Sequence, residues 1–271
     1  MPDRSAPSLA GTREMASWAI EVHMKVIGLL GGMSWESTVP YYRTINQAVG
    51  RRLGGLHSAK IVLYSVDFHE IERLQHAGAW DEAGRVLAAA AQMIARAGAD
   101  FLVICTNTMH KVVPVIEQAI PIPILHIADA TAMAIGQAHV RTVGLLGTRF
   151  TMEEDFYVGR LRDRHGLTVL VPDTDERETA HRIIYDELCL GRILDASRNT
   201  YRRIIQGLVA RGAHGIILGC TEVSMLVGPG DAPVPMFDTT ELHALQAVEW
   251  ALDDEKSGSN QRTPSVPRTV S

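Results

Sequence analysis

Residues 26–31 read VIGLLG and residues 142–147 read TVGLLG, so one short apolar stretch occurs twice in the chain. Two further stretches repeat in the same order: RAGADFLVI at 96–104 returns as ARGAHGIIL at 210–218, and IPIPIL at 120–125 returns as APVPMF at 232–237. Three blocks in register are much harder to attribute to chance than one shared fragment. The chain is therefore predicted to contain two homologous halves.

Each half alternates short apolar runs with amphipathic stretches of helical period, such as 80–97 and 196–211. The expected strands are near-continuous apolar runs, as is typical of parallel strands covered on both faces. They lie at 25–30, 59–65, 101–105, 142–146, 168–171 and 215–218. This alternation indicates an α/β fold with parallel, doubly wound sheets. Because ligands of such sheets bind beyond the carboxyl ends of the strands, we expect a site in the cleft between two pseudo-symmetric halves.

The two ends of the chain differ in composition from the rest. Residues 1–23 show no sustained period, and residues 255–271 have the Ser, Pro and Gln bias of disorder. We therefore predict a disordered extension at 1–23 and a disordered tail at 255–271. Residues 24–127 together with 239–254 are expected to form the first α/β half, and residues 128–238 the second.

Composition argues against several classes of protein. The 271 residues carry a net charge of −5 without a long basic run, which disfavours nucleic acid or an anionic membrane as a partner. No apolar run approaches the roughly 20 residues of a membrane span. Three cysteines are too few for a disulfide framework, so a reducing, cytoplasmic location is expected. The histidines lack the spacing typical of a metal site, and we predict no metal.

The repeat also determines which loop residues correspond in the two halves. Thr106 lies eight residues after Gly98, and Cys220 lies eight residues after the matching Gly212. Both follow a predicted strand directly, so we expect them to face each other across the cleft. Because side chains alternate along a strand, Cys105 is expected to point away from that cleft.

These loops carry a resemblance to a known family. GLLGGM at 28–33, CTNT at 105–108 and GCTE at 219–222, on duplicated halves, resemble the aspartate/glutamate racemases. The longer stretches GGMSWEST at 31–38 and SVDFHE at 65–70 are similar to the broad-specificity and L-aspartate/glutamate branch. The resemblance covers residues 24 to about 253.

The resemblance implies an amino-acid racemase that moves the α-proton without pyridoxal phosphate or another cofactor, and it implies a homodimer. Two groups on opposite faces of the substrate act as base and acid, and here they would be Cys220 and Thr106. The second-half cysteine would serve the L enantiomer. A position after a strand and before a helix is expected to lower the pKa of Cys220. Substrate binding is assigned to Met33, Gln75, Asn107, Thr108, Thr148, Thr151, Thr221 and Glu222.

Three positions depart from the family pattern. Thr106 stands where the family has its first cysteine, and a hydroxyl is a much weaker acid and base than a thiol. Some relatives bind the distal carboxylate of the substrate with an arginine, where this chain offers only His69, Arg73 and Gln75 as polar candidates. Cys189, for which a structural role is expected, replaces a lysine of some relatives. Without those two cations, we expect a broader or altered range of amino acids.

Two other functions fit the same residues. A decarboxylase of activated malonates, in the same superfamily, needs only one thiol to protonate an enolate, and Thr106 opposite Cys220 favours it. A binding protein that kept the cleft but lost turnover is the second alternative. The racemase is preferred because the stretches at 31–38 and 65–70 resemble the racemase branch.

Overall fold

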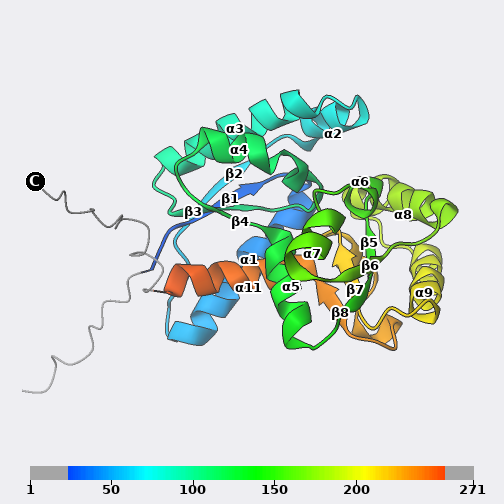
Figure 1. The fold of residues 1–271 in the computed structure, drawn as a ribbon. Helices are drawn as coiled ribbons and strands as arrows, with labels where there is room; N and C mark the ends of the chain where they lie inside the picture. The colour runs from blue at the N-terminus through cyan, green and yellow to red at the C-terminus, as the bar shows by residue number, and fades with distance from the viewer. Residues whose placement is uncertain (1–23, 254–271) are drawn as a thin grey trace, which may run out of the picture.

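The computed structural model describes residues 24–253, which form two four-stranded parallel sheets flanked by helices (Figure 1). The predicted extension at 1–23 and the predicted tail at 255–271 lie outside the described residues. The first sheet has the order β2-β1-β3-β4, and the second has the order β6-β5-β7-β8. The strand order is the same within each half, which confirms the predicted α/β class and its duplication.

Each predicted strand region holds a strand, and two short strands, β4 and β8, come in addition. The first sheet contains β1 (Ile27–Gly31), β2 (Ile61–Ser65), β3 (Phe101–Ile104) and β4 (Ile124–Leu125). The second contains β5 (Thr142–Gly147), β6 (Thr168–Leu170), β7 (Ile216–Gly219) and β8 (Met236–Asp238). Both added strands begin directly after the second proline of a repeated proline pair, because proline has no N–H to donate to a ladder.

The repeated GLLG stretches occupy central strands. In the first sheet, Leu30 of β1 lies opposite Tyr64 of β2 and Ile104 of β3. In the second sheet, Leu146 of β5 lies opposite Leu218 of β7. All of β1 is buried, which explains why its sequence is continuously apolar rather than alternating.

Eleven α-helices connect and cover the sheets within the described chain. Those that pack on the first sheet are α1 (Trp35–Leu53), α2 (Phe68–His76), α3 (Trp80–Arg96), α4 (Val113–Ala119) and α11 (Thr239–Leu252). The others are α5 (Ile127–Gln137), α6 (Arg149–Glu153), α7 (Val158–His165), α8 (Thr174–Asp186), α9 (Asp195–Ala210) and α10 (Val223–Leu226). After α3 and α9, the repeated Gly98 and Gly212 take φ values of 93° and 100°, a region that favours glycine.

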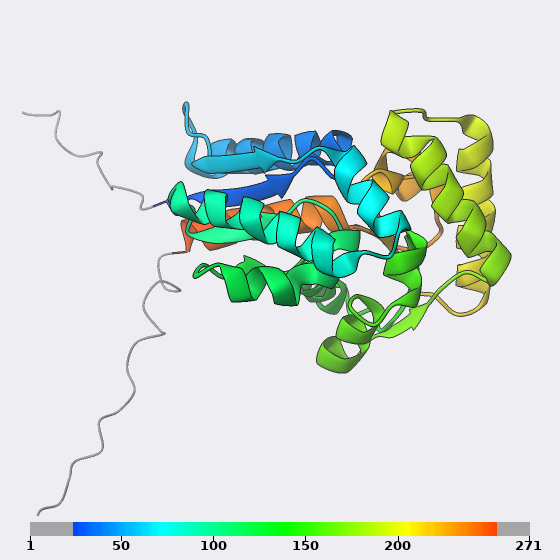
Figure 2. The ribbon, with the colours of Figure 1, turned by 90° about the horizontal axis from the view of Figure 1, so that it is seen from above.

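Three apolar clusters form the core, one on each face of the first sheet and one around the second. Leu87 of α3 and Ile116 of α4 belong to the cluster on one face, and Tyr41 of α1 and Ala247 of α11 to that on the other. Ile205 of α9 belongs to the third cluster. Helix α11, the last element described, therefore returns to the first sheet and packs beside α1. Both views show these two helices next to each other (Figures 1 and 2).

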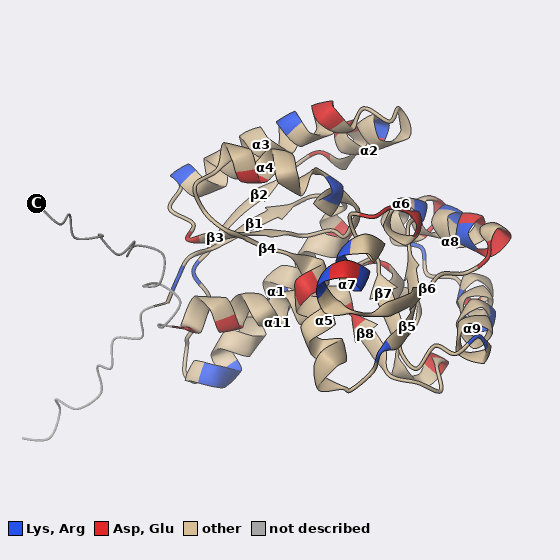
Figure 3. Ribbon diagram, viewed as in Figure 1, with Lys and Arg blue, Asp and Glu red and all other residues tan. Residues whose placement is uncertain are grey.

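Charged residues of both signs mix on the outer helices, as along α7 and α8 (Figure 3). None of the helices between residues 24 and 253 is long and apolar enough to cross a membrane.

Candidate active site

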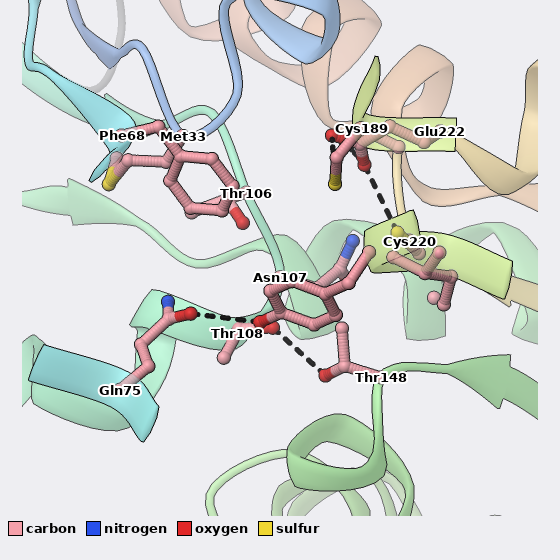
Figure 4. Close-up of a pocket in the computed structure, with 14 residues that line it drawn as sticks. Met33, Phe68, Gln75, Thr106, Asn107, Thr108, Thr148, Cys189, Cys220 and Glu222 are labelled. Atoms are coloured by element: carbon pink, nitrogen blue, oxygen red, sulfur yellow. Dashed lines mark hydrogen bonds between the residues drawn. The ribbon is translucent and has the colours of Figure 1, made fainter. Parts of the chain in front are cut away.

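A pocket of about 330 Å³ lies between the strand-end loops of the two sheets (Figure 4). Each of these loops follows one of the repeated strands β1, β3, β5 and β7. Together they contribute Met33, Thr106, Asn107, Thr108, Thr148, Gly219, Cys220, Thr221 and Glu222. The remaining lining comes from α2 and from α8 with the turn after it, namely Phe68, Gln75, Ile184, Tyr185 and Cys189.

Thr106 and Cys220 occupy matching places in the two halves. Thr106 follows β3, Cys220 follows β7, and both line the pocket although both are buried. Cys105 is fully buried instead in the core cluster between the first sheet and helices α1 and α11. The structure therefore places the neighbouring side chains Cys105 and Thr106 on opposite faces, in agreement with the register of the repeat.

Glu222 is the centre of a buried hydrogen-bond cluster. Its Oε1 accepts from the Ser34 hydroxyl at 2.8 Å and from the Cys189 thiol at 3.7 Å. Its Oε2 accepts from the Cys220 thiol at 3.1 Å and from the Thr221 hydroxyl at 2.6 Å. Glu222 lines the pocket as predicted for a substrate-binding residue, but its two oxygens are already engaged by protein donors.

The expectation that the loop lowers the pKa of Cys220 is wrong. Burial raises the pKa of the Cys220 thiol well above its usual value, and the negative charge of Glu222 raises it further. The following helix α10 has only four residues, so its dipole offers little compensation. Cys220 is therefore held as a protonated thiol that donates to a carboxylate.

The loop of Thr106 is supported by a histidine. The carbonyl oxygen of Thr106 can only accept, so the Nδ1 of His110, 2.8 Å away, must carry the proton of that ring. The Nε2 of His110 then accepts from the backbone N–H of Ile127 at 3.2 Å. Burial lowers the pKa of His110 well below its usual value, in agreement with this neutral form.

Asn107 offers an acceptor to the pocket. The Thr239 hydroxyl donates its proton to the carbonyl of Leu218 at 2.8 Å, so it must accept from the Nδ2 of Asn107 at 3.0 Å. This contact fixes the orientation of the amide. The Oδ1 of Asn107 is buried and has no hydrogen-bond partner among the described residues.

Three threonines connect the first and second halves at the floor of the pocket. The hydroxyls of Thr108 and Thr148 are 3.0 Å apart, and those of Thr148 and Thr151 are 3.1 Å apart. Thr148 also caps α6, because its hydroxyl accepts from the backbone N–H of Thr151. Thr151 is fully buried behind Thr148 and does not line the pocket, so its prediction as a substrate contact is corrected.

The other predicted contacts, Met33, Gln75 and Thr221, all line the pocket. The Oε1 of Gln75 accepts from the Tyr185 hydroxyl at 2.8 Å, so this pair links α2 to α8 across the cleft. Figure 4 shows Gln75 and Met33 on the α2 side of the pocket and Cys220 on the opposite side.

Sequence reasoning did not assign several of the residues found here. Cys189, expected to be structural, lines the pocket, and its thiol donates to Glu222. Tyr185 and Phe68 are stacked, with ring centroids 6.5 Å apart. One signal was available for Tyr185 and Cys189: they are four residues apart, which is one helical turn.

No group of three or more metal-binding side chains occurs in the part of the chain that the structure describes. His110 and His126 do lie together, with ring centroids 4.5 Å apart. Both are buried, and their nitrogens bond to backbone atoms at Thr106, Ile127 and Ala128. These rings therefore act as parts of the core.

Two matching loops, with a thiol in one and a hydroxyl in the other, line one pocket between homologous halves. Residues 30–247 match the model of the Asp/Glu/hydantoin racemase family, so the chain belongs to that family. The sequence-based prediction of an amino-acid racemase, an isomerase, is thereby confirmed.

Similar proteins agree with this family. A curated relative, the broad specificity amino-acid racemase RacX of Bacillus subtilis, is 22% identical over 84% of this chain and 98% of its own. A crystal structure from Yersinia pestis, of a protein assigned to the Asp/Glu racemases, is 59% identical, with a TM-score of 0.79 over 85% of this chain and all of that one.

A crystal structure of an aspartate racemase homologue from Pyrococcus horikoshii is 34% identical, with a TM-score of 0.72 over 85% of this chain and all of that one. The two-domain fold also occurs in more distant solved structures, including the glutamate racemase of Francisella tularensis, which is 14% identical with a TM-score of 0.57. That last likeness concerns the fold alone.

Proposed function

We propose that Cys220 and Thr106 are the two groups that remove and return the α-proton of an amino acid held between them. One observation carries the proposal: both side chains line one pocket from matching strand ends of homologous halves. Groups on opposite sides of an α-carbon can take a proton from one face and give one to the other.

Glu222 supplies the acceptor that a buried thiol needs. As the Cys220 sulfur takes the α-proton, the proton already on that sulfur moves along the 3.1 Å hydrogen bond to Oε2 of Glu222. The electron pair of the broken C–H bond remains on the substrate as a carbanion, delocalised into its carboxylate. Return of a proton from Thr106, or from a water that it holds, gives the opposite enantiomer.

The remaining polar groups hold the two ends of a zwitterion. The unpartnered Oδ1 of Asn107 is a suitable acceptor for the α-ammonium group. The hydroxyls of Thr108 and Thr148 bond to each other, and that of Thr148 also bonds to Thr151; both can turn to donate to the α-carboxylate. Such donors stabilise the charge that develops on that carboxylate as the proton leaves.

The test combines two measurements on one sample. Single enantiomers of aspartate, glutamate and neutral amino acids are incubated in D₂O, with inversion followed by chiral chromatography and α-hydrogen exchange by proton NMR. Inversion of at least one of them is expected. The proposal would be contradicted if folded protein neither exchanged the α-hydrogen nor inverted the configuration of any of these amino acids. Release of carbon dioxide from aryl or alkyl malonates would instead support the decarboxylase. Calorimetric binding of an amino acid without exchange would support the binding protein.

The proposal includes a homodimer in the cytoplasm. Three apolar side chains at successive turns of α1, Trp35, Val39 and Tyr42, are exposed and form a stripe that a second copy could cover. The three cysteines, all within the described residues, are free thiols, which agrees with a reducing compartment. Light scattering is expected to give twice the chain mass, and Val39→Lys is expected to lower it to one chain. A monomeric wild type would contradict the dimer.

A further inference from the structure

One side of the pocket is formed by helices rather than by the strand-end loops. Phe68 and Gln75 come from α2, Ile184 and Tyr185 from α8, and Cys189 from the turn that follows α8. The loops hold the acid/base pair and the polar groups suited to the α-ammonium and α-carboxylate. The helical side is therefore left for the side chain of the substrate.

This side of the pocket contains no cation. Among the described residues that line the whole pocket, only Glu222 is charged, and it is an anion. His69 and Arg73 are exposed on α2 and do not reach the lining. Lys111 does not line the pocket either, and it is paired with Glu154 at 2.6 Å. A second carboxylate on the substrate would find no positive partner here.

The polar group that the helical side does offer is neutral. Gln75 is buried, its Oε1 accepts from Tyr185, and its Nε2 donates to the sulfur of Met109 at 2.9 Å. A thioether is a weak acceptor, so this NH₂ group can donate to a better acceptor of the substrate. Phe68 and Ile184 make the rest of the surface apolar.

We infer that the site selects amino acids with uncharged side chains and disfavours aspartate and glutamate. This inference rests on the proposed function. A neutral amino acid enters as a zwitterion without net charge. Aspartate or glutamate would bring an additional buried negative charge near Glu222 without a partner, which is unfavourable. The Gln75 amide provides a hydrogen bond to a hydroxyl or amide of the substrate, but it provides no charge.

The experiment compares isosteric pairs that differ in charge. The kcat/KM for α-hydrogen exchange is measured for L-asparagine against L-aspartate and for L-glutamine against L-glutamate. The amide is expected to exceed the acid at least tenfold in each pair. Equal values, or faster exchange of the acids, overturn the inference while leaving the racemase intact. Absence of exchange with every amino acid contradicts the proposed function instead.

A charge introduced into the helical side tests the residues themselves. Gln75→Arg is expected to shift the acid-to-amide ratio at least tenfold towards the acid. Cys189→Lys provides a second variant if the first does not fold. Gln118→Arg adds the same charge at an exposed position of α4, outside the pocket, and is expected to leave the ratio unchanged. A ratio unchanged in folded Gln75→Arg and Cys189→Lys overturns the assignment of this side.

Discussion

The loops after β3 and β7 occupy the same place in the two halves but differ in their ionisable groups. Thr106 and Cys220 correspond, and two residues later Thr108 corresponds to Glu222. Thr108 shares a hydrogen bond with the hydroxyl of Thr148, whereas Glu222 accepts from the Cys220 thiol. At these two positions the second-half loop therefore has a thiol and a carboxylate, and the first-half loop has two hydroxyls.

The groups that form hydrogen bonds to the two loops also differ in charge. The carbonyl of Thr106 is held by the neutral imidazole of His110, whereas Cys220, Thr221 and Ser34 are held by a carboxylate. Duplication thus kept the backbone frame, and the two halves diverged in how each can move a proton. If these groups move the α-proton, α-hydrogen exchange with solvent is expected to be faster from one enantiomer than from the other.

The largest effect is expected from Cys220→Ser. A hydroxyl is a much weaker acid and base than a thiol, so α-hydrogen exchange from the L enantiomer should fall about 100- to 10,000-fold, the range of general acid–base catalysis. Cys105→Ser is the matched control, because it changes the neighbouring loop's buried cysteine, which faces the core. Comparable losses of exchange rate in two folded variants would refute the assignment of Thr106, rather than Cys105, to the cleft.

A smaller effect is expected at the opposite face. The L substrate should gain α-deuterium faster than it inverts, because Thr106 or its water is a weak acid and Cys220 often reprotonates the carbanion after its own proton has exchanged with solvent deuterium. Thr106→Ala should reduce initial exchange from the D enantiomer about 100-fold. Thr106→Cys should narrow the difference between L and D. Equal initial rates from L and D, unaffected by Thr106→Ala, would mean that Thr106 is not the second group.

Glu222→Gln tests the acceptor in the second-half loop. Loss of a charged hydrogen-bond partner should reduce exchange from the L enantiomer about tenfold. Because the charge of Glu222 raises the pKa of Cys220, its removal should shift the pH dependence of alkylation of Cys220 to lower pH. A Cys105→Ser, Cys189→Ser background isolates this thiol. An unchanged alkylation profile would show that Glu222 does not act on Cys220.

The repeat predicted the frame of the site because strand alternation and equal spacing are local properties. They placed Thr106 and Cys220 in the cleft and Cys105 in the core. The pKa of Cys220 was not predictable in this way, since it depends on burial and on a carboxylate held by Ser34, which lies in a distant loop. The pKa of Cys220 is therefore set by how the two halves pack across the cleft.

The surroundings of Cys189 and Thr151 were not predictable for the same reason. Cys189 approaches Glu222 only because α8 and its turn pack against the second sheet. Thr151 was predicted to contact the substrate, but it lies in the first turn of α6, which Thr148 caps, and its side chain is buried in the interior. Distances along the chain do not reveal either arrangement.

The smallest expected effect concerns stability, and it belongs to the first half alone. His243, on α11, is fully buried, and its Nε2 must carry a proton because it donates to the carbonyl of Leu125 at 2.8 Å. Its Nδ1 then accepts from the Tyr41 hydroxyl at 2.9 Å. Burial lowers the pKa of His243 to about 4, so the folded state holds this ring neutral at pH values where the unfolded chain is already protonated.

The contribution of the neutral His243 ring to the free energy of unfolding is complete above the ordinary histidine pKa of about 6.5, and it is lost as the pH falls towards 4. Denaturant titrations between pH 7 and pH 4 should therefore show a falling free energy of unfolding. His243→Gln does not titrate, and its amide can still donate to Leu125, so the slope of that fall should decrease. His57→Gln, at an exposed position, is the control and should leave the slope unchanged. Identical slopes in the wild type and His243→Gln would show that the neutral ring does not contribute to the pH dependence of folding.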